Sequence, residues 1–84
     1  MSEDLHRAAL DKAFEGIERT GYQDLLERLS AGYSSIGFTR SRAIITRLKK
    51  FLVKYGMIKQ EDRKYVYNRD FHYVPLNIDQ TRIE

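Results

Sequence analysis

The sequence predicts an α+β fold in which three helices precede a two-stranded β-hairpin. Over the first part of the chain, apolar residues recur at intervals of three or four, as they do in helices that bury one face. After Gly56 the interval changes to two, which is the spacing of a half-buried strand. A chain of 84 residues, 42% of them hydrophobic, is long enough for one modest core and one domain.

The first helix is predicted over residues 4–19. Its apolar face consists of residues at intervals of four: Leu5, Ala9, Ala13 and Ile17. The helix is expected to end before Gly21, because glycine accepts the left-handed conformation that closes a helix. His6 is expected to be a solvated residue of this helix.

A second, shorter helix is predicted over residues 22–31, with a buried edge of leucines: Leu25, Leu26 and Leu29. We expect Gly32 to stop it. Residues 33–39 contain the small polar residues and the glycine of a turn, from which Ile36 and Phe38 can reach the core.

Residues 40–55 carry the clearest helical pattern, with Thr39 or Ser41 available as the N-cap and Gly56 after the last turn. At about 100° per residue, one face is apolar, with Ile45 at its border: Ile44, Leu48, Phe51, Leu52 and Tyr55. The opposite face is polar and is flanked by Arg47 and Lys54: Arg42, Thr46, Lys49 and Lys50. Val53 is expected to be exposed on this polar side.

The hairpin is predicted from strands over residues 57–60 and 64–68, joined by the charged tip at residues 61–63. Tyr65 and Tyr67 are expected to pack in the sheet rather than to stack on nucleobases. We assign residues 1–70 to the domain and residues 71–84 to a C-terminal extension, in which Pro75 allows at most an edge strand over residues 71–74.

Charge is segregated along the chain. Residues 1–30 contain seven acidic and four basic residues, a net charge of −3, whereas residues 40–64 contain nine basic and two acidic residues, a net charge of +7. Such segregation points to a polyanionic partner on one face. The plainer alternative is a solvated helix face that is basic without binding anything.

The predicted order of elements is that of a winged helix-turn-helix domain. Residues 39–68 resemble the recognition-helix-and-wing half of regulators of the MarR and ArsR type: a capped helix with a leucine, a pair like Tyr55-Gly56, an aliphatic pair like Met57-Ile58, and a charged turn before a tyrosine-rich strand. The connection over residues 32–38 is longer than the tight turn of those regulators.

This resemblance implies sequence-specific binding of double-stranded DNA, with the helix at residues 40–55 in the major groove. The N-terminal half of the helix offers side chains to base edges: Arg42, Ala43, Thr46 and Arg47. Phosphate contacts are expected from Arg40, Ser41, Lys49 and Lys50, and contacts of the wing with backbone or minor groove from Arg63 and Lys64. One alternative stays open, that Arg47 pairs with an acid of the first helix, whereas Lys54 is expected to complement the helix dipole.

Catalysis finds little support in the sequence. The absence of cysteine excludes a disulfide, a thiolate zinc site and a cysteine nucleophile. The two histidines lack metal-ligand spacing, and the GYSSIG segment lacks the lysine of a phosphate-binding loop. We therefore expect no enzymatic activity, no cofactor and no small-molecule ligand. The polar N-terminus and the absence of a long apolar run indicate a cytoplasmic protein that is not in a membrane.

Two functions follow from these expectations. The first is a small stand-alone transcriptional regulator that binds DNA as a homodimer, with an interface formed by the first helix and residues 71–83. The apolar residues of this extension could equally pack within one subunit. The second function is a winged-helix adaptor that binds an acidic protein through the same basic face.

Overall fold

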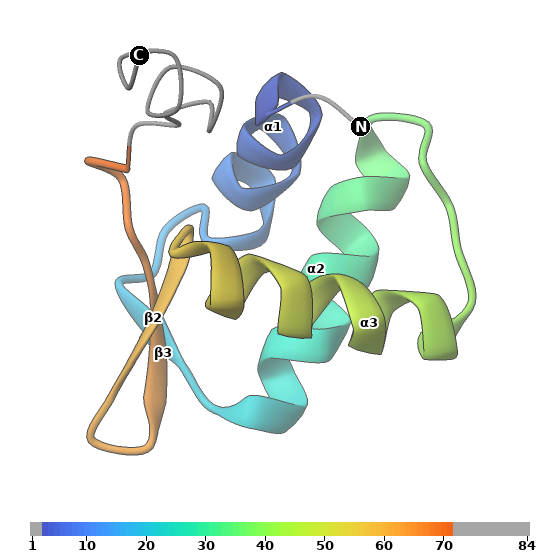
Figure 1. The fold of residues 1–84 in the computed structure, drawn as a ribbon. Coiled ribbons are helices and arrows are strands. Elements are labelled where there is room, and N and C mark those ends of the chain that lie inside the picture. The colour runs from blue at the N-terminus through green and yellow to red at the C-terminus, as the bar shows by residue number, and fades with distance from the viewer. Residues whose placement is uncertain (1–2, 72–84) are drawn as a thin grey trace, which may run out of the picture.

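The computed structural model describes residues 3–71, which form three helices and a small antiparallel sheet (Figure 1). The helices are α1 (Glu3–Ala13), α2 (Tyr22–Ser35) and α3 (Arg42–Tyr55). The strands are β1 (Arg19–Thr20), β2 (Ile58–Glu61) and β3 (Lys64–Tyr67). The predicted α+β fold, with three helices before a hairpin, is confirmed. The sheet has one strand more than predicted, because β1 joins the hairpin.

Helix α1 is shorter than predicted, because it ends at Ala13 instead of residue 19. Gly16, three residues after the end of the helix, has a φ of +80° in a turn in which the Ile17 amide donates to the Phe14 carbonyl, so the chain leaves the helix before it reaches Gly21. The chain then extends into β1, in which Arg19 lies opposite Val66 and Thr20 opposite Tyr65 of β3.

Helix α2 is longer than predicted and continues through Gly32 to Ser35. The expected stop at Gly32 is wrong; the left-handed glycine after this helix is Gly37, with a φ of +87°. The turn between α2 and α3 is correspondingly shorter than predicted. As expected, Ile36 and Phe38 pack against the core from this turn.

The core lies where the three helices meet the sheet. Its largest fully buried side chains come from every helix and from the start of the hairpin: Leu10, Phe14, Leu25, Leu29, Tyr33, Ile45, Leu52, Met57 and Ile58. His6 is also buried, so its expected solvation is wrong. Its Nδ1 lies 2.7 Å from the hydroxyl oxygen of Tyr33 on α2. Burial lowers the pKa of His6 and raises that of Tyr33, which keeps both partners of this hydrogen bond neutral.

Helix α3 begins at Arg42, two residues later than predicted, because Ser41 is the N-cap and its Oγ accepts a hydrogen bond from the Ile44 amide. It ends at Tyr55 and is capped by Gly56, whose φ of +99° lets its N–H donate to carbonyls of the last turn. The buried face is rotated from the predicted one and is centred on Ile45, Leu48 and Leu52. Phe51, which was assigned to that face, is 42% exposed, and Val53 is half-buried against the core instead of exposed.

The hairpin confirms the predicted pairing of two strands. Strand β3 lies in the middle of the sheet, between β1 and β2. Glu61 pairs with Lys64, so the turn consists of Asp62 and Arg63 alone, one residue fewer than predicted. Both turn residues have positive φ, 49° and 66°, as a tight hairpin turn requires. As expected, the tyrosines of β3 are buried in the packing of the sheet.

Candidate nucleic-acid interface

One stripe of α3 faces away from the core and carries positive charge. The stripe, which we call the basic stripe, consists of four exposed residues at spacings of four, three and four: Ala43, Arg47, Lys50 and Lys54. No acidic residue lies in α3, and none of the ion pairs within residues 3–71 involves this stripe. The expected alternative, an ion pair between Arg47 and α1, is therefore not formed within this part of the chain.

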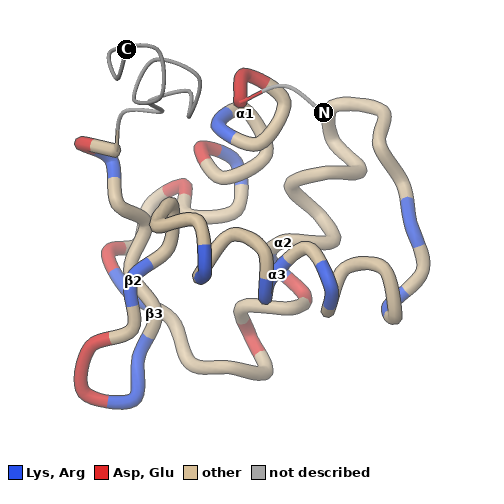
Figure 2. Tube along the Cα trace, viewed as in Figure 1, with Lys and Arg blue, Asp and Glu red and all other residues tan. Residues whose placement is uncertain are grey.

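The distribution of charge over the fold sets α3 apart from the other helices. Figure 2 shows basic residues and no acidic residue along α3, whereas α1 and the hairpin carry residues of both signs. The acids of the first turns are Glu3 and Asp4 in α1 and Asp24 in α2. Positive charge is thus concentrated on the helix whose outer side is open to a partner.

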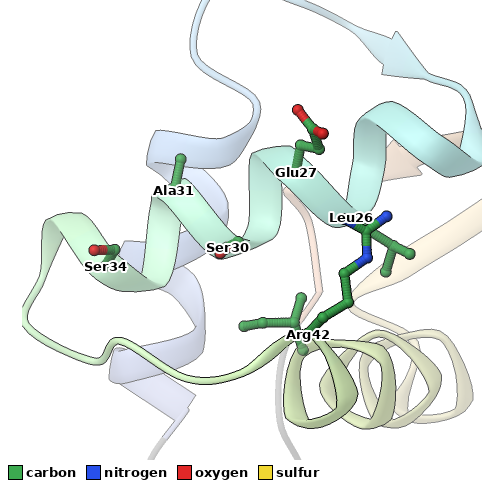
Figure 3. Close-up of a pocket in the computed structure, with 7 residues that line it drawn as sticks. Leu26, Glu27, Ser30, Ala31, Ser34 and Arg42 are labelled. Carbon is green, nitrogen blue, oxygen red and sulfur yellow. The ribbon is translucent and has the colours of Figure 1, made fainter.

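Two basic residues of α3 lie on the flank of the helix instead of the centre of its exposed side. Arg42 lines a shallow groove of about 400 Å³ between α2 and the first turns of α3 (Figure 3), lined further by Leu26, Glu27, Ser30, Ala31, Ser34 and Ile45. The Nζ of Lys49 lies 4.7 Å from the ring centre of Tyr22 and 5.7 Å from that of Tyr65. Arg42 is exposed as expected and Lys49 is half-buried, but both lie at the edge of the exposed face that they were expected to occupy, because the helix is rotated about its axis.

The other expected contacts near the start of α3 are partly engaged in local interactions. Thr46 is half-buried, and its hydroxyl donates to the Arg42 carbonyl at 2.9 Å. Ser41 uses its side chain to cap α3. Arg40 is exposed, and its guanidinium lies 3.7 Å from the ring centre of Phe38 while it donates to the Thr39 carbonyl. The planar group of Arg40 is thereby held beside the first turn of α3.

The hairpin tip carries mixed charge. Arg63 and Lys64 are exposed there, next to Asp62 of the turn. Glu61 on the same tip lies 3.8 Å from a guanidinium nitrogen of Arg19 on β1. Arg63 and Lys64 can be reached by a partner because both are exposed, although Asp62 beside them keeps the charge of the tip mixed.

Two residues of this surface were not identified from the sequence as binding residues. Lys54 was assigned to the helix dipole, although its spacing from Lys50 and Arg47 already places the three on one stripe. Tyr22 carried no signal at all, since its contact with Lys49 depends on how α2 packs beside α3 and the sheet.

Other kinds of site find no support in the described part of the chain. Residues 3–71 contain no group of three or more His, Cys, Asp or Glu side chains that could hold a metal ion. Among these same residues, no helix is long and apolar enough to cross a membrane. The expected edge strand at residues 71–74 and most of the extension lie outside the described residues.

Comparisons with protein-family models, with curated proteins and with solved structures find no match to this chain. Its function is therefore inferred from the geometry and charge of α3 and the hairpin.

Proposed function

We propose that the chain binds double-stranded DNA as a winged-helix protein, with α3 in the major groove and the β2–β3 hairpin as the wing. The observation that carries the proposal is the basic stripe of α3, three exposed cations at helical spacing with no acidic partner within residues 3–71. A single helix fits the major groove of B-form DNA, and cations along its outer side can reach bases and the phosphates that border the groove.

The order of the elements is compatible with this fold. Helix α3 follows α2 after a short turn, and the antiparallel hairpin follows α3 directly after Gly56. In a winged helix this order places the recognition helix and the wing next to each other, so both can contact one duplex. Arg63 and Lys64 would then meet the DNA backbone or the minor groove.

The proposed role is that of a small transcriptional regulator that acts as a homodimer. One domain of this size contacts too few base pairs for a unique genomic site, and a second copy doubles the contacts. We place the interface at α1 and the aromatic rings beside it. The stacked rings of Phe51 and Tyr55 are 5.0 Å apart, and the ring of Phe71 lies 5.5 Å from that of Tyr55.

The test of DNA binding is a fluorescence anisotropy titration of a labelled duplex at several salt concentrations. About four to six phosphate contacts for each protomer would give a slope of log affinity against log salt of roughly −4 to −5. The reason is that each neutralised phosphate releases a condensed counterion. Binding that is independent of salt, or no binding at low salt, would contradict the proposal and favour the adaptor that binds an acidic protein.

Discrimination between DNA sequences is expected to depend on Arg47 more than on Lys54. Arg47 lies in the N-terminal half of α3, where a forked contact with guanine contributes about 1–3 kcal/mol of discrimination. Arg47→Ala should therefore weaken binding to the preferred site more than binding to random DNA. Lys54→Ala, in the last turn of the same stripe, should weaken both equally, because a phosphate contact carries no sequence information. Identical behaviour of the two variants across sequences would show that α3 does not read bases through Arg47.

Analytical sedimentation at micromolar concentrations tests the proposed dimer. The wild-type chain is expected to sediment as a dimer, and Phe51→Gln as a folded monomer, because the change removes an exposed apolar ring from the interface. Tyr22→Gln is the matched control, since Tyr22 is 40% exposed and contacts Tyr65 and Lys49 instead of the rings of Phe51 and Tyr55. A wild-type monomer, or equal effects of the two substitutions, would contradict this interface.

A further inference from the structure

Lys49 differs from the other lysines of α3 in what holds its side chain. Its Nζ lies near two aromatic rings, 4.7 Å from the centre of Tyr22 and 5.7 Å from that of Tyr65. The two rings are themselves in contact, with centres 6.2 Å apart. Lys50, the next residue, is exposed and has no such neighbour within residues 3–71.

The two tyrosines come from different parts of the fold. Tyr22 is the first residue of α2 and is 40% exposed, whereas Tyr65 lies in the central strand β3 and is only 7% exposed. Tyr65 is therefore held in the sheet, and the more exposed ring of Tyr22 lies beside it. The Lys49 ammonium lies where α2, α3 and the sheet meet.

We propose that Tyr22 and Tyr65 form a cradle that positions the Lys49 ammonium for a backbone phosphate of DNA, on the flank of α3 that faces the start of α2. The inference rests on the proposed DNA-binding function and adds Tyr22 to it as a positioning residue. The aromatic faces attract the cation from one side, and the ammonium has three donors, so its remaining N–H groups can bind an anion.

The physical advantage of the cradle is a smaller loss of conformational freedom on binding. A lysine side chain that must be immobilised on a phosphate loses much of its rotamer freedom. Lys49 has already given up part of that freedom in the free protein, because its ammonium is held beside two rings. The contact also fixes where one strand of the duplex lies relative to α2. Arg42 lies on this same flank but borders Glu27 in the groove, and no aromatic ring within residues 3–71 holds it.

A double-mutant cycle on duplex DNA tests the cradle. Tyr22→Leu removes the ring and should weaken binding by about two- to fivefold, the range expected for an exposed cation–π contact. Tyr22→Phe keeps the ring and should bind almost as the wild type does. In the Lys49→Met background, Tyr22→Leu should have no further effect, since its only route to the DNA is the ammonium. Tyr65 is left unchanged, because its burial makes any substitution a change of the core.

A second measurement on the free protein detects the cradle without DNA. Ring currents of the two tyrosines should shift the Lys49 ε-methylene protons upfield in NMR spectra of the wild type and of Tyr22→Phe, and this shift should decrease in Tyr22→Leu. The inference would be overturned if Tyr22→Leu reduced the affinity for DNA equally in the wild-type and Lys49→Met backgrounds. It would also be overturned if Tyr22→Phe bound DNA as weakly as Tyr22→Leu. If the wild type binds no duplex, the proposed function itself fails, and the role of the cradle fails with it.

Discussion

Reversal of the two central charges of the basic stripe, by the double substitution Arg47→Glu and Lys50→Glu, is expected to weaken duplex binding by about a hundredfold or more at 0.1 M salt. With a salt slope of about −0.9 for each phosphate contact, the loss of one contact weakens binding by roughly eightfold at this salt concentration. Two lost contacts and the repulsion between the new carboxylates and the phosphates together give the larger figure. Anisotropy titrations of the wild type and the variant on the same duplex measure it.

The control must change the net charge equally without touching α3. The pair Arg19→Glu and Arg69→Glu does so outside α3 and α1, because both residues are exposed and their ion pairs, with Glu61 and with Asp11, are exposed as well. A general effect of net charge would weaken both double variants alike. If α3 is the specific site, the control should lose little affinity for DNA. Equal losses of affinity in the two double variants would show that the charge of the whole molecule attracts DNA.

The elements that the sequence predicted best are those whose ends are marked locally. Ser41 and Gly56 bound α3 because one offers a capping oxygen and the other accepts a φ of +99°. The hairpin followed from the change of apolar spacing to two, although its turn is one residue shorter than predicted because Glu61 pairs with Lys64. In these segments the residues that decide the structure lie next to one another in the chain.

The ends of α1 and α2 were wrong because a glycine has more than one structural use. Gly16 closes the connection after α1 through its positive φ, whereas Gly32 lies inside α2 with no such conformation. Only the packing of α1 against α2 distinguishes a glycine that ends a helix from one that lets two helices approach. The strand β1 was missed for a related reason: its two residues form a strand only because β3 pairs with them.

In the candidate site, too, local sequence predicted some features and tertiary packing decided the others. Charge counting placed the basic residues on α3 correctly, but the rotation of the helix decided which of them face outward. Ile45 is almost completely buried where a border position was expected, and this rotation moves Arg42 and Lys49 to the flank. It also places Lys54 in line with Lys50 on the exposed side. Tertiary packing sets the rotation of the helix about its axis. The helical period alone does not distinguish two buried faces that differ by one residue position.

Substitution of Gly32 by alanine is expected to lower the free energy of unfolding by about 1–3 kcal/mol, although alanine is the better helix former. A Cβ at this position would lie 2.3 Å from the Ala9 carbonyl oxygen and 3.2 Å from the Ala13 amide nitrogen. Both are backbone atoms of α1, so neither can swing aside as a flexible side chain would. For a domain of this size, the melting temperature should fall by roughly 4–8 °C for each kcal/mol, which thermal unfolding followed by circular dichroism detects.

The matched control for Gly32→Ala is Gly21→Ala, because Gly21 has an ordinary φ of −79° and no atom within 4 Å of its added Cβ. Its substitution should cost less than about 1 kcal/mol, the effect of changing an N-cap residue that makes no side-chain hydrogen bond. Gly32→Val should be more damaging than Gly32→Ala, since its larger side chain must displace α1 further. That displacement would reach the pair of His6 and Tyr33, which links the same two helices. If Gly32→Ala instead raised the melting temperature, helix propensity would outweigh packing, and α1 could not lie as close to α2 as the structure places it.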